Sequence, residues 1–387
     1  MPSLIVSAAE RVPDVATLLA PLRADGAMAH LALGYRALEG RVWGGARATV
    51  ASSDESAGLW ATVDGILLPG AGMHDLRVIS QADLDAAQHP QRLAWPLDLE
   101  RWSRTIGALG AHVWQRLTSL RLGIIGCGRT GSLIATTAVR MGVRDLTLID
   151  PDLVERHNLG EMDGVSISDV GRSKVQALAD FLHRQCGRSH EEMAISAVAE
   201  PVVTAYRAAL PADVLFCCVD NDAARLACGI IATLFHKVLI DVGTGILNEP
   251  ASSASAPLPA DARLMGADVR LILPADGCLI CFGNLANYEA ALAELAHGNR
   301  KPRADRQRWW EQRQGSLRTL NMLAASLAMQ MLCDLIAGRI QSSAWMQVRY
   351  DRSGAISVER LTRSSLPAPG RCFLCLRAGL GDDGLMW

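Results

Sequence analysis

Glycines at nucleotide-binding spacing are the first residues in this chain that could do chemistry. Three of them follow a short apolar run at G-x-G-x-x-G spacing: Gly126, Gly128 and Gly131. Glycine lets a backbone approach a phosphate, and a following helix presents free N–H groups to it. Residues 132–143 predict that helix, and residues 145–149 predict a second strand that ends in Asp150, an acid placed to hold a ribose hydroxyl. This pattern predicts a nucleotide site without deciding between NAD and ATP.

Four of the ten cysteines form two C-x-x-C pairs, Cys278 with Cys281 and Cys372 with Cys375. Each pair can offer two thiolates to one metal ion, and two pairs complete a tetrahedral zinc set with no open position. We therefore predict a structural zinc site that ties the end of the chain to the segment after the sheet. Unligated or redox-active pairs are the alternative.

Composition limits the class of protein. The chain has 387 residues, of which 50% are hydrophobic and 20% charged, and its net charge is −2. These values predict one large or two modest domains and give no argument for nucleic acid or an anionic membrane as partner. We recognise no secretory signal, transmembrane helix or disulfide framework, so we expect a reduced, cytoplasmic protein.

Strands and helices alternate after the glycines. Apolar runs predict strands at 194–201, 214–219 and 238–242, and helices are predicted at 171–184 and 223–234. This order predicts an α/β fold with a Rossmann-like, doubly wound, mostly parallel sheet. Ligands of such sheets bind at the carboxyl ends of the strands, which places the glycine loop, Asp150 and Asp220 on one rim.

The two ends of the chain are predicted in less detail. Residues 1–98 are assigned to a small α+β accessory domain that packs or docks partners, with a helix within 5–22 and strands at 42–50 and 59–68. Residues 99–377 form the nucleotide domain, which opens with an approach helix at 99–120, and residues 378–387 form a tail.

The later part of the nucleotide domain is predicted to return to strands. These strands are at 269–273, 345–350 and 356–361, with a buried apolar helix at 319–337. Residues 282–315 are either a mobile loop over the site or solvated surface.

Ordered motifs from Arg101 to Cys375 resemble the MoeB/ThiF and ubiquitin-activating enzyme superfamily. RWSR at 101–104 resembles the family's R-Y-x-R-Q, and DPDLV at 150–154 with Asn158-Leu159 resembles D-x-D-x-V…N-L. VGRSK at 170–174 resembles V-G-x-x-K, and Asp220-Asn221 with Arg225 resembles D-N-x-x-x-R. The two C-x-x-C pairs fall in the family's places.

The resemblance implies adenylation of a carboxylate, usually the C-terminal glycine of a ubiquitin-like or sulfur-carrier protein, with release of pyrophosphate. It implies ATP, Mg²⁺ and structural zinc as cofactors. Asp220 would bind Mg²⁺, Lys174 the phosphates and Asp150 the ribose, while Arg104 would reach the partner's ATP across a homodimer. The other implied nucleotide contacts are Gly126, Gly128, Arg129, Gly131, Asp152, Asn158, Asn221 and Arg225.

Two departures from the family pattern matter. The family's N-L-x-R-Q continues here with Glu161 and Met162, so an acid replaces a phosphate-binding arginine; Arg129 or Arg156 would have to substitute. The crossover segment after the first C-x-x-C holds no cysteine before Cys333, so no family-style thioester is expected. The adenylate would then pass to an acceptor directly or to the cysteine of a conjugating enzyme. Cys127, at a helix N-terminus, is the other thiol considered.

Three further functions stay open beside activation of a ubiquitin-like protein. A peptide-modifying enzyme similar to the microcin maturases would use residues 1–98 to clamp a precursor peptide. An inactive scaffold would follow from Glu161. A nicotinamide oxidoreductase fits the glycine loop but leaves Arg104, Lys174 and Asp220 unexplained.

Overall fold

The computed structural model describes most of the chain after residue 98. The described residues are 99–186, 193–247, 264–274, 276–283, 288–297, 317–351, 353–362, 372–378 and 381, together with seven short strands within residues 1–98.

The first hundred residues contain a five-stranded sheet of order β2-β4-β5-β1-β7 and a separate pair, β3 with β6. Their bounds are β1 Ser3–Val6, β2 Met28–Ala29, β3 Trp43–Gly44, β4 Ala48–Ala51, β5 Trp60–Thr62, β6 Ile66–Leu67 and β7 Leu76–Ile79. The helix predicted within 5–22 is wrong at Ile5 and Val6, which belong to β1; residues 7–22 lie outside the described residues. The strands predicted at 42–50 and 59–68 are each two shorter strands.

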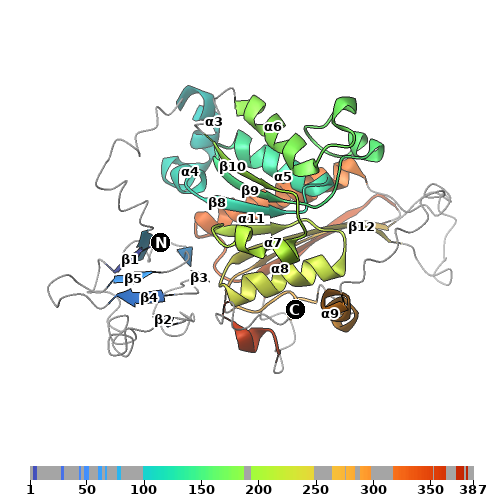
Figure 1. The fold of residues 1–387 in the computed structure, drawn as a ribbon. Helices are drawn as coiled ribbons and strands as arrows, with labels where there is room; N and C mark the ends of the chain where they lie inside the picture. The colour runs from blue at the N-terminus through green and yellow to red at the C-terminus, as the bar shows by residue number, and fades with distance from the viewer. Residues whose placement is uncertain are drawn as a thin grey trace.

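An eight-stranded sheet of order β10-β9-β8-β11-β12-β13-β14-β15 forms the rest of the described fold (Figure 1). The strands are β8 Arg121–Ile125, β9 Asp145–Ile149, β10 Ala194–Val198, β11 Val214–Cys217, β12 Val238–Leu247, β13 Leu264–Ile272, β14 Ala344–Tyr350 and β15 Ile356–Thr362. The first five strands in this order pair in parallel, and the last three join them as antiparallel partners. The predicted α/β class is confirmed.

Helices cover both faces of this sheet (Figure 1). They are α3 Leu99–Leu109, α4 Ala111–Thr118, α5 Arg129–Arg140, α6 Lys174–Cys186, α7 Val202–Ala209, α8 Asp222–Leu234, α9 Tyr288–His297 and α11 Arg318–Ile336. Apolar side chains of α5, α6 and α11 pack on one face, and those of α7, α8 and α9 pack on the other. Strand β11, buried along its whole length, lies between the two layers, as its unbroken apolar run predicts.

The helix α11 is long and apolar enough to span a membrane by length and composition, with 19 residues and a mean hydropathy of 1.4. Within the described fold it packs instead on α5 and the sheet, where residues such as Ala324, Ala328 and Leu332 are fully buried. This burial confirms the prediction of a core helix.

The approach helix is broken by Gly110, whose φ of 82° lies in the left-handed region, so α3 and α4 are two helices. Trp102 donates its ring N–H to the carbonyl of Arg140 and Trp114 to that of Met141, at 3.1 and 2.9 Å. Both tryptophans therefore anchor this pair of helices at the C-terminal end of α5.

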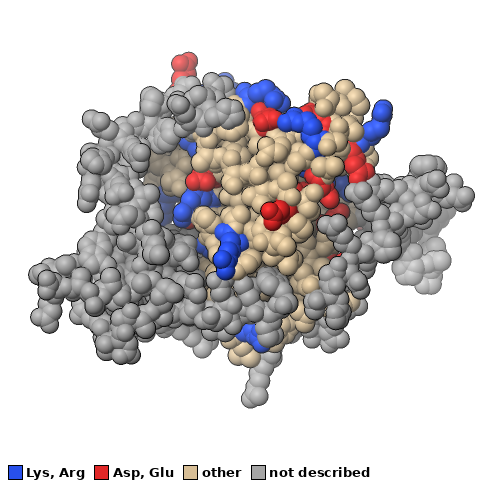
Figure 2. Space-filling model, viewed as in Figure 1, with Lys and Arg blue, Asp and Glu red and all other residues tan. Residues whose placement is uncertain are grey.

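The predicted mobile segment 282–315 contains the helix α9, which packs on α8 through the buried Ala291. Residues 284–287 and 298–316 lie outside the described residues. Where the fold is described, Figure 2 shows basic and acidic side chains interspersed on the visible face, in keeping with the small net charge.

His236 links α8 to β12 in a left-handed conformation with a φ of 48°. Lys237 donates its N–H to the carbonyl of Ala232 at 2.8 Å, which closes the helix as a C-terminal cap. The His236 side chain is buried, and its Nε2 has no hydrogen-bond partner among the described residues. Burial lowers the pKa of His236 from 6.5 to about 4.

Acid should therefore destabilise the fold through His236. Between pH 6.5 and pH 4 the unfolded chain binds a proton at this residue that the folded chain does not. Stability is then lost as pH falls, by about 2 kcal/mol at pH 5. His236→Asn keeps a residue that tolerates positive φ and removes this titration. Urea unfolding at pH 7 and pH 5 should show the stability difference between variant and wild type shifting by that amount in favour of the variant; an unchanged difference would contradict it.

Candidate active site and metal centre

The glycine turn after β8 packs directly against the end of β11. Gly126 has a φ of 86°, and a Cβ on it would lie 2.7 Å from the carbonyl oxygen of Cys218. A Cβ on Gly131 would lie 1.9 Å from the carbonyl oxygen of Gly126. A Cβ on Gly128 would meet no atom within 4 Å. Packing therefore requires the outer two glycines, whereas the open space at Gly128 is where a phosphate would fit.

Asp150 ties the glycine turn to the end of β9. Its carboxylate accepts the N–H of Cys127 at 2.7 Å and the N–H of Asp152 at 2.8 Å. Burial raises the pKa of Asp150, and the nearby Lys174 opposes the rise. Each carboxylate oxygen has a second acceptor position, so these bonds leave room for a ribose hydroxyl.

Lys174 and Asp152 are brought together by pairing between two loops. Leu153 pairs with Ser173 in an isolated β-bridge, and the N–H of Lys174 bonds the carbonyl of Asp152 at 3.0 Å. The Lys174 ammonium, with only 11% of its side chain exposed, lies 2.9 Å from the Asp152 carboxylate, which is 52% exposed. The two predicted motifs thus meet, and a largely buried ammonium lies close enough to Asp150 to lower its pKa.

Asp220 lies in the exposed turn between β11 and α8, next to the glycine turn. Asn221 caps α8 by accepting the N–H of Ala224 at 2.7 Å. Arg225 donates to Asp241 at 2.9 Å and to the carbonyl of Val219 at 2.7 Å. The contacts of Asn221 and Arg225 are internal, and their role toward nucleotide stays a prediction.

The loop after Asn158 is attached to α11. Asn158 is buried and caps its own 3₁₀ turn by accepting the N–H of Glu155 at 2.8 Å. The Glu161 carboxylate accepts from Asn321 at 3.2 Å, and Arg318 donates to the Glu161 carbonyl at 2.8 Å.

Arg318, the first residue of α11, brings to this loop a cation that the motifs did not identify. It also binds Asp163, whose N–H bonds the Ser132 hydroxyl in the first turn of α5. No local signal could reveal this arginine, because 157 residues separate it from Glu161.

The remaining predicted arginines lie at different places. Arg129 is half-buried at the start of α5, beside the glycine turn, and Arg156 is exposed. Arg104 is exposed on α3, which Trp102 anchors at the far end of α5. A helix of 12 residues is about 18 Å long, so α5 separates Arg104 from the glycine turn of its own chain.

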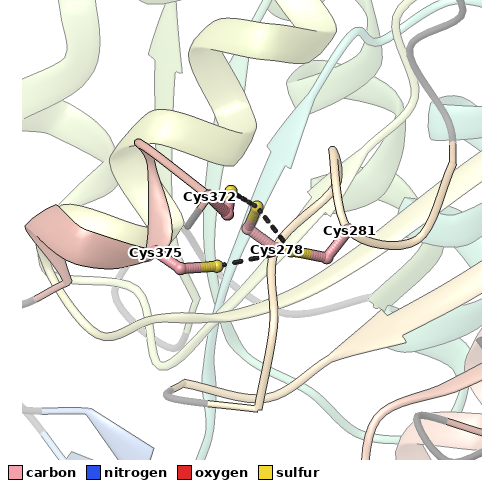
Figure 3. A group of neighbouring side chains, drawn as sticks. All are labelled: Cys278, Cys281, Cys372 and Cys375. Carbon is pink, nitrogen blue, oxygen red and sulfur yellow. Dashed lines mark hydrogen bonds between the residues drawn. The ribbon is translucent and has the colours of Figure 1, made fainter. Parts of the chain in front are cut away.

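The four C-x-x-C cysteines converge on one point beside α8 (Figure 3), with their sulfur atoms all within 4.8 Å of one another. The Sγ distances are 3.8 Å for Cys278–Cys281, 3.6 Å for Cys278–Cys372 and 3.5 Å for Cys281–Cys375. Four sulfurs around a tetrahedral zinc ion at 2.3 Å lie about 3.8 Å apart. Hydrogen bonding among the four thiols lowers the pKa of Cys281 and Cys372 and raises the pKa of Cys278 and Cys375. These residues fit zinc.

The thiols considered as nucleophiles are buried. Burial raises the pKa of Cys127 well above its usual value, with Asp150 adding to the effect, so the helix N-terminus does not determine its state. Burial also raises the pKa of Cys333 to about 11. Neither thiol is poised for attack in this structure.

The fold and these contacts define a class: an α/β protein with a Rossmann-like sheet, a glycine turn that could accept a phosphate and four cysteines that could hold one metal ion. The ThiF family profile matches residues 102–364, more than half of the chain, so the chain belongs to the ThiF family.

Two curated relatives match parts of the chain. The adenylyltransferase and sulfurtransferase uba4 of Aspergillus niger is 26% identical over 51% of this chain and 44% of its own length. The SAMP-activating enzyme E1 of Haloferax volcanii is 34% identical over 22% of this chain and 32% of its own length. The chain thus spans less than half of the length of these relatives.

Among solved structures, E. coli MccB with MccA-N7isoASN matches at a TM-score of 0.51 and 16% identity. The match covers 86% of this chain and 99% of that chain. At this identity the match shows a shared fold.

Two alanine substitutions should separate packing from ligand binding in the glycine turn. Gly131→Ala forces a Cβ against the Gly126 carbonyl and should cost about 2 kcal/mol or more of stability. Gly128→Ala enters open space, so it should lower the melting temperature less than Gly131→Ala does and weaken ATP binding at least about 10-fold. Thermal unfolding and calorimetric titration with Mg·ATP measure the two effects. Unchanged ATP affinity in Gly128→Ala would contradict this assignment.

Loss of one cluster thiol should release the metal. Cys372→Ser replaces a soft ligand by a poor one, so the purified protein should hold well under one zinc ion per chain and melt at a lower temperature. Cys333→Ser, which changes a buried cysteine outside the cluster, is the matched control and should keep its zinc. Elemental analysis decides; full zinc content in Cys372→Ser would refute the four-cysteine assignment.

Proposed function

We propose that this protein adenylates the C-terminal carboxylate of a ubiquitin-like or sulfur-carrier protein, with ATP as donor and pyrophosphate as leaving group. Membership of the ThiF family supports the reaction class. The observation that carries the proposal is the contact between the glycine turn and the turn that holds Asp220. Because of this contact, a phosphate bound at the glycine turn and an Mg²⁺ ion bound by Asp220 would lie at the same edge of the sheet.

The residues of this rim suit the reaction. The attacking carboxylate oxygen forms a bond to the α-phosphorus while the bond from this phosphorus to the bridging oxygen of pyrophosphate breaks. Lys174 would balance the negative charge that develops on the phosphate oxygens. Asp220 would hold the Mg²⁺ that offsets the charge of the leaving pyrophosphate. Asp150 would orient the ribose while it holds the glycine turn in place.

A homodimer would complete the site. Arg104 is exposed at the end of α5 opposite to its own glycine turn, so it is placed to serve a neighbouring chain rather than its own. The resemblance of RWSR to the family's R-Y-x-R-Q motif supports the same role. The buried state of Cys127 and Cys333 favours transfer of the adenylate without an enzyme thioester.

A precursor peptide is the second candidate substrate. The strands at the start of the chain form a five-stranded sheet ahead of the family region, and such a module could clamp a peptide. E. coli MccB, which shares the fold, has been solved with MccA. A carboxyl-terminal residue other than glycine on the substrate would favour this candidate.

ATP–pyrophosphate exchange tests the proposal. Exchange should require a glycine-ended ubiquitin-like protein, and Asp220→Ala should lower the rate about 100-fold or more, because the leaving pyrophosphate loses its metal. The matched control is Asp222→Ala, which removes a neighbouring exposed acid and should change the rate little. Exchange only with a short peptide would select the second candidate, and no ATP binding at all would refute adenylation.

A further inference from the structure

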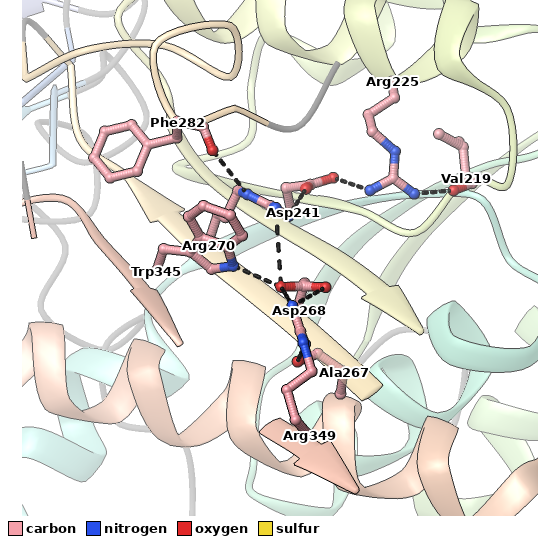
Figure 4. Close-up of polar contacts among 9 residues, drawn as sticks. All are labelled: Val219, Arg225, Asp241, Ala267, Asp268, Arg270, Phe282, Trp345 and Arg349. Carbon is pink, nitrogen blue, oxygen red and sulfur yellow. Dashed lines mark hydrogen bonds and ion pairs between the residues drawn. The ribbon is translucent and has the colours of Figure 1, made fainter. Parts of the chain in front are cut away.

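Three charged side chains form a row: the partly buried Arg225 on α8 and the buried Asp241 on β12 and Arg270 on β13 (Figure 4). Asp241 is fully buried, and Arg270 is 4% exposed. Arg225 donates to one Asp241 oxygen at 2.9 Å, and the Arg270 guanidinium lies 3.5 Å from the other. One carboxylate is therefore shared between two guanidinium groups.

Each end of this row holds a backbone carbonyl in a different site. Arg225 donates through its second amino group to the carbonyl of Val219, the residue before Asp220, at 2.7 Å. Arg270 donates through Nε to the carbonyl of Phe282, the residue after Cys281, at 3.3 Å. The row thus connects the turn of Asp220, which would hold Mg²⁺, to the turn from Cys278 to Cys281, which would contribute two zinc ligands.

Burial restricts the movement of the side chains in this row. A carboxylate without water contact is stable as a charge only while its cationic partners stay in place. Asp241 holds Arg225 by a hydrogen bond and Arg270 by charge attraction, because Nη1 of Arg270 has no hydrogen-bond partner among the described residues. Burial alone would lower the pKa of Arg225, but Asp241 raises it above the usual value. Burial lowers the pKa of Arg270, and Asp241 and Asp268 oppose the shift.

A second set of contacts prevents Arg270 from turning away. Its guanidinium carbon lies 4.0 Å from the centroid of the Trp345 ring, and Trp345 donates to Asp268 at 2.7 Å. Arg349 also binds Asp268, at 2.9 Å, and its side chain is 36% exposed. This branch contacts neither Val219 nor Arg225 among the described residues, so Arg349 offers a control in the same network.

We propose that Arg225 and Asp241 are positioning residues that couple the four-cysteine zinc site to the Mg·ATP turn. The coupling rests on the proposed function, because it needs Mg·ATP to bind at Asp220. Bound zinc would fix the position of the turn from Cys278 to Cys281. Arg270 and Asp241 would transmit this position across β13 and β12, and Arg225 would fix the carbonyl of Val219, which precedes Asp220. Such coupling is reciprocal, so zinc should tighten nucleotide binding and nucleotide should tighten zinc binding by the same factor.

The test measures zinc affinity of the full chain by competition with a chromophoric chelator. It is done with and without Mg²⁺ plus α,β-methylene ATP, whose α–β bridge the reaction cannot break. In the wild type this nucleotide should raise zinc affinity at least about 5-fold more than in Arg225→Lys. Lysine keeps the charge but lacks the rigid fork whose two amino groups bind Asp241 and the Val219 carbonyl separately. Coupling that arises only from general stabilisation of the fold would be at least as large in this less stable variant, so it cannot produce the expected difference.

Two more variants define the outcome. Arg349→Gln should keep the wild-type ratio, and Asp241→Asn should lose it as Arg225→Lys does; if Asp241→Asn does not fold, Arg225→Lys decides. Equal ratios in wild type and Arg225→Lys, with the nucleotide bound to both, would overturn the coupling and leave the proposed function intact. Absence of nucleotide binding to the zinc-loaded wild type would overturn both.

Discussion

The close approach of two backbone turns is the constraint on which the site depends. Gly126 lies against the carbonyl of Cys218 with no space for a Cβ, and Gly131 lies as closely against Gly126. Because β8 and β11 are neighbours in the sheet, this contact fixes the distance between the phosphate cradle and the turn of Asp220. The Asp150 carboxylate adds the end of β9 to the same contact. Backbone geometry, which changes little with side-chain motion, thus places the groups that would act on ATP.

Features that are local in sequence could be predicted from it. The strand 145–149 and the helix at the glycines follow from apolar runs and turn residues, and the structure places them within a few residues of the prediction. The zinc ligands could be predicted because a C-x-x-C spacing fixes a thiol pair by itself, and all four sulfurs do meet. The break at Gly110 could not be predicted, because a glycine within an apolar periodic stretch looks the same in the sequence whether or not the helix continues.

Contacts between distant segments could not be predicted in the same way. Apolar runs do not encode strand direction, so the antiparallel pairing of β13, β14 and β15 with the parallel half depends on the packed fold. Arg225 shows the same limit for a side chain. Its motif suggested a nucleotide contact, but its guanidinium meets Asp241 and the carbonyl of Val219. A motif identifies a residue whose position matters, and only the structure shows whether it acts on ligand or through a neighbour.

The charge balance around Glu161 follows from tertiary contacts rather than from the motif. An acid in place of the family's arginine would repel a triphosphate if it were unpaired in low dielectric. Here Asn321 donates to this carboxylate, and Arg318 brings a cation to the same loop from the start of α11. Asp163 orients that cation and is itself tied to the first turn of α5, whose N-terminus would receive the phosphates. Glu161 is therefore held by α11 through Asn321, while the charge of Arg318 is paired with that of Asp163.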